Sequence, residues 1–136
     1  MADNFRRPGN LLAQLDLESG SVVRVVRGNG ANFDEIAHHP DTGTRIVGIV
    51  VPNWQEVTRL ALEGAKVLEE MPLVGWDIAP VDSGAVIVEL NETPDFKLHQ
   101  VADRRGMLDA TLKTFLAERK NHAARWLSKS KQTRRR

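Results

Sequence analysis

The sequence contains no cysteine and no long run of apolar residues. Without thiols, disulfide bonds, thiolate zinc sites and a cysteine nucleophile are excluded, which is compatible with a reducing compartment. No segment approaches the roughly 18 apolar residues that a membrane span requires. The N-terminal residues Met-Ala-Asp-Asn-Phe-Arg-Arg also lack the apolar run of a signal peptide. We therefore expect a soluble, cytoplasmic protein with no membrane partner.

The length of 136 residues fits a single domain that folds without disulfide or metal staples. Its charge is unevenly distributed, because all 18 acidic residues lie at or before Glu118, whereas 8 of the 19 basic residues follow it. We expect residues 1–128 to form the domain and residues 129–136 to form a basic, disordered tail. Such a tail can contact nucleic acid. No aromatic residues alternate with its charges to stack on bases, however, so a nucleic-acid partner is not expected.

The N-terminal third of the chain is patterned for strands. Two apolar runs separated by the polar turn at residues 16–20 predict a hairpin over residues 10–27. From Arg27 to Thr44 the composition changes to Gly, Asn, Asp, His and Pro, which predicts a long loop. A strand is expected to follow at about Ile46–Val51.

Two helices are predicted further along the chain. Asn53 and Glu56 have the spacing of a capping box, and apolar residues then recur every three or four positions, so a helix begins here and packs on a sheet. Gly64 interrupts this helix at a cost of ~1 kcal/mol relative to alanine, which indicates close approach to a neighbouring strand. A last helix is expected to start near Asp103. Together these elements predict an α+β fold, with an antiparallel sheet and helices packed on one of its faces.

Residues 75–94 carry the pattern with the most chemical content and are predicted to form a β-hairpin. A three-residue loop at Asp82–Gly84 places Asp77 opposite Glu89, with Asn91 on the same face. A loop of two or four residues would put the two acids on opposite faces. Facing carboxylates repel unless water, a basic neighbour or a cation offsets them. The face is therefore either a candidate Mg²⁺ site or a solvent-facing surface with unrelated acids.

The other face of this hairpin is predicted to be the core side, under the helices. Alternation along the two strands places apolar side chains there, whereas Ile87 falls on the acidic face. The predicted core residues of the hairpin are Val74, Trp76, Ile78, Val86, Val88 and Leu90.

Several short segments together resemble a known family. Gly-Trp-Asp-Ile-Ala at 75–79 and the Glu-x-Asn-x-x-Pro pattern at 89–94 resemble the C-terminal end of the ATP-grasp fold. Other segments are similar, in the same order, to the sugar-transfer-associated ATP-grasp family, and the resemblance covers most of residues 3–100. These segments are Asp3-Asn4-Phe5, residues 15–20, residues 39–43 and Pro52-Asn53-Trp54.

The resemblance implies that Asp77, Glu89 and Asn91 are ligands of Mg²⁺ bound to ATP, within a fold that resembles an incomplete C-terminal ATP-grasp lobe. It implies the chemistry of ligases that activate a carboxylate as an acylphosphate, which an amine or other nucleophile then captures. The identities of that carboxylate and nucleophile are left open.

An ATP-grasp enzyme also needs an upstream phosphate loop and basic phosphate contacts, and the first lysine here is Lys66. We therefore expect the upstream phosphate-binding half to be missing, and activity to depend on an upstream ATP-grasp segment as a partner. The alternative is a non-catalytic ATP-grasp remnant that acts as an interaction module through its basic C-terminal helix.

Overall fold

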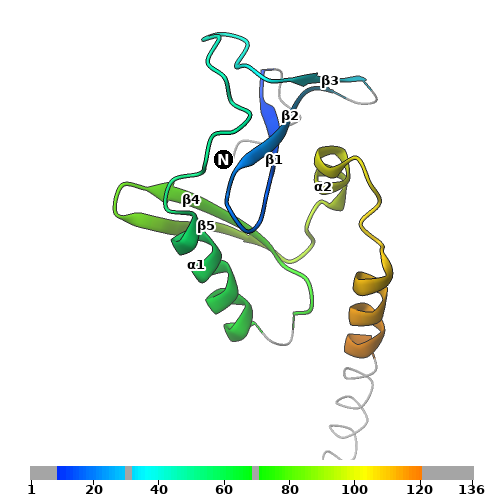
Figure 1. Cartoon of the computed structure of the whole chain (residues 1–136). Helices are drawn as coiled ribbons and strands as arrows, with labels where there is room; N and C mark the ends of the chain where they lie inside the picture. Colours follow the sequence, from blue (N-terminus) through cyan, green and yellow to red (C-terminus); the bar gives the residue numbers. More distant parts are fainter. Residues whose placement is uncertain (1–8, 30–31, 69–70, 121–136) are drawn as a thin grey trace, which may run out of the picture. The chain divides into compact units, whose positions relative to one another are not determined.

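The computed structural model describes residues 9–29, 32–68 and 71–120. Its contacts divide the chain into two compact units, Met1–Arg105 and Gly106–Arg136. The elements of the first unit are β1 (Leu11–Leu15), β2 (Val22–Asn29), β3 (Asn32–Ile36), α1 (Trp54–Val67), β4 (Gly75–Val81), β5 (Gly84–Asn91) and α2 (Phe96–Asp103) (Figure 1).

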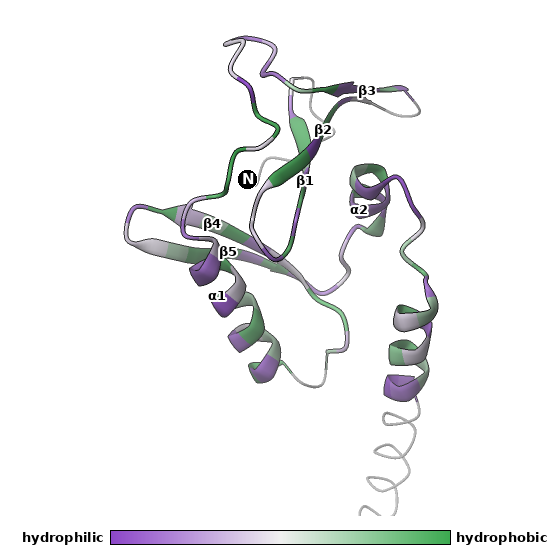
Figure 2. Cartoon of the chain, viewed as in Figure 1, coloured by the Kyte–Doolittle hydropathy of each residue, from purple (hydrophilic) through white to green (hydrophobic). Residues whose placement is uncertain are grey.

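The first three strands form an antiparallel sheet in the order β1-β2-β3. Val22, Val25 and Val26 of β2 are buried, and α2 packs against β1 and β2 and adds Ala102 to this small core. The centre of β2 is correspondingly hydrophobic in Figure 2. The hairpin predicted over residues 10–27 is confirmed, because β1 pairs with β2 across the polar turn.

The predicted loop between Arg27 and Thr44 is wrong in its first half. β2 continues to Asn29 and pairs with β3, so this polar stretch forms a second hairpin. Main-chain pairing does not require apolar side chains, and Gly28 supports it, because a Cβ there would lie 2.2 Å from the Asn32 carbonyl oxygen. Composition alone therefore misassigned a strand in which three of the five residues are polar and exposed.

The strand predicted at Ile46–Val51 is also absent. Here the chain turns, and its extended pairing is limited to an isolated bridge between Ser21 and Val50. Gly48 has a φ of 95°, which interrupts an extended run, yet its N–H donates to the Val22 carbonyl at 2.8 Å. The segment thus lies against the start of β2 without forming a strand of its own.

Helix α1 forms as predicted, but its first turn is not capped as expected. Asn53 adopts a left-handed conformation with φ 54° and makes no side-chain capping bond. Its Nδ2 instead donates to the Val81 carbonyl at 2.6 Å, and Glu56 pairs with Arg59. A side chain on a left-handed residue does not point at the first helical amides as a β-region cap does. Asn53 therefore links the start of α1 to the end of β4.

Gly64 confirms the predicted close approach of α1 to a strand. A Cβ at this position would lie 2.7 Å from Cη2 of the Trp76 ring in β4. At the other end of α1, the Trp54 indole donates to the Leu17 carbonyl at 3.0 Å. A Cβ on Gly20 would lie 2.4 Å from the same indole, so α1 also contacts the β1–β2 turn.

The last helix does not start near Asp103, because α2 ends at that residue. Asp95 caps α2 by accepting a backbone hydrogen bond of 2.9 Å, and Arg104, in a left-handed conformation with φ 52°, terminates it. A second helical segment covers residues 110–120 after Asp109, whose carboxylate likewise accepts an amide of the first turn. The missed signal was the Asp95 cap directly after a proline.

The α+β class with antiparallel sheets is confirmed, with two sheets, β1-β2-β3 and β4-β5, in place of one. Within the described part of the chain, no helix combines the length and apolar character that crossing a bilayer demands.

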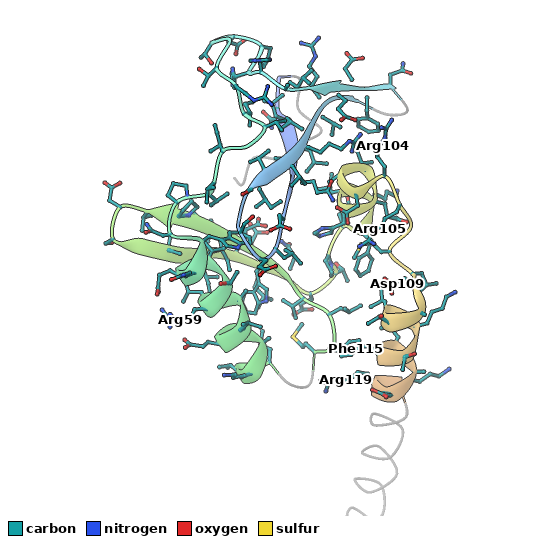
Figure 3. All side chains as sticks on the ribbon, in the orientation of Figure 1. Arg59, Arg104, Arg105, Asp109, Phe115 and Arg119 are labelled. Carbon is teal, nitrogen blue, oxygen red and sulfur yellow. The ribbon has the colours of Figure 1, made fainter. Side chains whose placement is uncertain are left out.

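In the second unit, the Arg119 guanidinium lies 5.3 Å from the centre of the Phe115 ring (Figure 3). The predicted tail at 129–136 lies outside the described residues, and so does most of the basic C-terminal segment.

Candidate metal-binding face of the hairpin

The β4–β5 hairpin places Asp77 directly opposite Glu89. The pairing was predicted, but the predicted loop length was wrong, because the turn contains two residues, 82–83, instead of three. That turn alone would set Asp77 opposite Val88 and turn Glu89 to the other face. A β-bulge leaves Val88 without a partner in β4 and shifts the register by one residue. The bulge therefore restores the pair of acids that the short turn would have separated.

The same register changes which apolar residues share the acidic face. Ile87 pairs with Ile78, which lies on the α1 side of the hairpin, and Val86 pairs with Ala79 on the acidic side. The predicted faces of Ile87 and Val86 are therefore reversed, because the two-residue turn displaces both by one position. The acidic face thus continues into an apolar strip toward the turn.

Asn91 is the third candidate ligand, and it pairs with Gly75 at the other end of the hairpin. It lies two positions after Glu89, so strand alternation places both on the same face. Asp77 likewise lies two positions after Gly75. The structure thus brings the three predicted side chains to one face, with Asp77 and Glu89 exposed and Asn91 half-buried.

In the described part of the chain, the two carboxylates of this face are exposed and have no basic partner. Within residues 9–29, 32–68 and 71–120, no side chain forms an ion pair with Asp77 or Glu89, and none hydrogen-bonds to the Asn91 amide. Their oxygen atoms are therefore available to a ligand. Two carboxylates and an amide oxygen are hard donors of the kind Mg²⁺ prefers, and an exposed face leaves room for its water ligands.

The described residues hold no group of three or more His, Cys, Asp or Glu side chains that could bind a metal. The candidate face contains two such residues, and its third oxygen comes from an amide. It therefore differs from a site built only from titratable ligands. The donor set nevertheless fits a divalent ion that keeps several waters or phosphate oxygens.

Arg59, the basic residue of α1 labelled in Figure 3, is already engaged by acids on its own helix. It contacts Glu56 at 2.9 Å and Glu63 at 2.7 Å. The hydrogen bond from Arg59 to Glu56, followed by the one to Glu63, raises the pKa of the guanidinium. These i,i+3 and i,i+4 pairs belong to the exposed surface of the helix.

Sequence reasoning missed Arg24, which connects β2, β3 and α2. Its guanidinium donates to Glu35 at 2.8 Å and to the carbonyls of Val101 and Ala102 at 2.8 and 2.6 Å. Arg104 also contacts Glu35, at 3.3 Å. The Arg24 hydrogen bond is the main reason that the pKa of Glu35 is lowered. Because these residues are far apart in the sequence, no local pattern indicates the cluster.

Fold and site together define an α+β domain with a hairpin that has two carboxylates and an amide on one face and a helix on the other. The model of the family described as sugar-transfer associated ATP-grasp matches residues 2–115. The chain belongs to the sugar-transfer-associated ATP-grasp family. Searches of curated proteins and of solved structures gave no match.

Proposed function

We propose that this protein binds ATP together with Mg²⁺, and that Asp77, Glu89 and Asn91 hold the metal ion. The observation that carries the proposal is the Asp77–Glu89 pair, which exists only because a bulge at Val88 corrects the register. Facing like charges destabilise a plain sheet. Bulges are common next to functional sites, where they re-aim a side chain. Membership of the ATP-grasp family supports the same function.

The three side chains have complementary roles. Asp77 and Glu89 supply two negative charges that balance a divalent cation, and Asn91 adds an oxygen ligand without a third charge. Mg²⁺ bound here would neutralise phosphate charge and polarise the terminal phosphoryl group of ATP. The paired strands hold the two carboxylates in place before the ligand arrives, which lowers the entropy lost on binding.

We place the protein with ligases that activate a carboxylate as an acylphosphate, which a nucleophile then captures. In that chemistry basic side chains must contact the phosphates. The candidate face has no such residue paired with Asp77 or Glu89 in the described part of the chain. We therefore expect catalysis to require phosphate contacts from an additional ATP-grasp segment, and nucleotide binding to be the activity measurable on this chain.

Isothermal titration of ATP into the protein, with and without Mg²⁺, tests the proposal. We expect Mg²⁺-dependent binding that Asp77→Asn and Glu89→Gln abolish. Asp82→Asn is the matched control, because it neutralises an exposed acid in the turn of the same hairpin. Binding that persists in both ligand variants, or that is absent from the unmodified protein, would refute the proposal.

Manganese provides a second measurement that does not depend on ATP. Mn²⁺ substitutes for Mg²⁺ at oxygen sites, and its unpaired electrons broaden the NMR signals of nearby nuclei. We expect low concentrations of Mn²⁺ to broaden the amide signals of residues 77, 89 and 91 first. Broadening spread evenly over the acidic residues would indicate nonspecific charge binding.

A further inference from the structure

The backbone at the open end of the hairpin is unusually close to the residues that follow β5. A Cβ built on Gly75 would lie 3.1 Å from Cβ of Pro94 and 3.4 Å from Cβ of Asn91. The first distance is shorter than an ordinary van der Waals contact, and the second is at the lower limit of one. The chain after β5 therefore folds back beside the first residue of β4, in space that a larger residue at position 75 would occupy.

Pro94 is constrained both by its own ring and by its link to helix α2. Its ring fixes φ, which limits the conformations available to the turn. Its carbonyl accepts a hydrogen bond from the Phe96 N–H at 3.1 Å, at the start of α2. The far end of α2 is tied to the three-stranded sheet by Arg24, through the Ala102 carbonyl at 2.6 Å. Pro94 thus lies between a paired strand and an anchored helix.

We propose that Gly75 is a positioning residue for Asn91, because glycine leaves free the space that a Cβ would take from Pro94 and Asn91. Strand ends fray, and a terminal asparagine with two free side-chain torsions loses entropy when it binds a ligand. A side chain at position 75 would meet both Pro94 and Asn91, so glycine there lets Asn91 keep its amide oxygen on the face of Asp77 and Glu89. This inference rests on the proposed role of Asn91 as a metal ligand.

The Gly75→Ala variant tests whether a Cβ at position 75 disturbs Asn91. Its new methyl group would push on Pro94 and Asn91, so we expect the Kd for Mg²⁺ with ATP to rise about 10-fold, the low end of the range for residues that support metal ligands. The double variant Gly75→Ala, Pro94→Gly removes the Cβ that the methyl meets. It should restore Kd to within about twofold, a rescue that general destabilisation would not produce.

Gly64→Ala is the matched control, because its methyl meets Trp76 on the opposite side of the hairpin. We expect this variant to lower Tm while leaving Kd unchanged. A loss of affinity in Gly64→Ala equal to that in Gly75→Ala would overturn the positioning role. A Gly75→Ala variant whose affinity the Pro94→Gly change does not restore would overturn it as well.

The side-chain amide signals of Asn91 in the metal-free protein separate this inference from the proposed function. Gly75→Ala should shift these signals, and the double variant should return them toward their original positions. If the unmodified protein binds no Mg²⁺ with ATP, the proposed function fails, while these signals still decide whether Gly75 positions Asn91. Unchanged Asn91 signals in Gly75→Ala would refute the inference.

Discussion

Arg24 donates a hydrogen bond of 2.6 Å to the carbonyl of Ala102, in the last turn of α2. The side chain of Arg24 is only 13% exposed, and its charge lies at the negative end of the helix dipole. A guanidinium has several donors in a fixed plane, so one residue can serve Glu35 and two helix carbonyls at once. This contact attaches α2 to the sheet.

Replacing Arg24 by methionine should lower the free energy of unfolding by about 2–3 kcal/mol, because charge-assisted hydrogen bonds at a nearly buried site are lost. Urea denaturation monitored by circular dichroism measures this change. Arg27→Met is the control, since Arg27 is half exposed and lies 3.7 Å from Asp34, and it should cost less than about 1 kcal/mol. Equal losses in the two variants would contradict the anchoring role of Arg24.

Acid should destabilise the protein in part through Glu35. Hydrogen bonding to Arg24 lowers the pKa of this carboxyl in the folded state. The contribution of Glu35 is therefore fully present above its unfolded pKa of about 4.3, and it is lost as the pH falls through the lower folded-state pKa. Urea midpoints between pH 6 and pH 3 should fall less steeply in Glu35→Gln than in the unmodified protein. An equal slope in Glu35→Gln and the unmodified protein would contradict this contribution of Glu35.

Substitutions at Asn53 can distinguish two roles of its side chain, capping helix α1 or donating a hydrogen bond to the hairpin. Aspartate caps helices as well as asparagine does, so Asn53→Asp would be nearly neutral at an ordinary cap. Here it removes the Nδ2 donor that reaches the Val81 carbonyl, and we expect a loss of about 1–3 kcal/mol in unfolding free energy. Asn53→Gly keeps the left-handed backbone accessible and should lose about 1 kcal/mol. A neutral Asn53→Asp variant in chemical denaturation would contradict the observed hydrogen bond.

Gly64→Ala should destabilise the protein, although alanine is favoured over glycine by ~1 kcal/mol within a helix. The added methyl would lie 2.7 Å from the Trp76 ring and would push α1 from the hairpin, at a net cost of about 1–3 kcal/mol. Combining it with Trp76→Leu should recover part of the loss, because the smaller side chain makes room. A rise in Tm for Gly64→Ala alone would show that α1 and β4 do not approach this closely.

The candidate site could be predicted only in part. Alternation and turn chemistry placed Asp77, Glu89 and Asn91 on one hairpin face, and this grouping agrees with the observed register. The hairpin geometry predicted for it was wrong, because the structure has a two-residue turn and a bulge in place of the three-residue loop. A bulge has no strong sequence signal, because many residue types can occupy the unpaired position. The packing of neighbouring side chains determines where the bulge forms.

The sequence by itself determined the local elements: the hairpin over residues 10–27, the amphipathic helix α1 and the family to which the chain belongs. Tertiary structure alone decided the strand pairing of β3, the role of Asn53, the Arg24 anchor and the bulge at Val88. Hydrophobic periodicity and turn formers act between residues close in the chain, and so they can be read from it. Register and long-range hydrogen bonds depend on which surfaces meet after folding, and segments read separately do not contain that information.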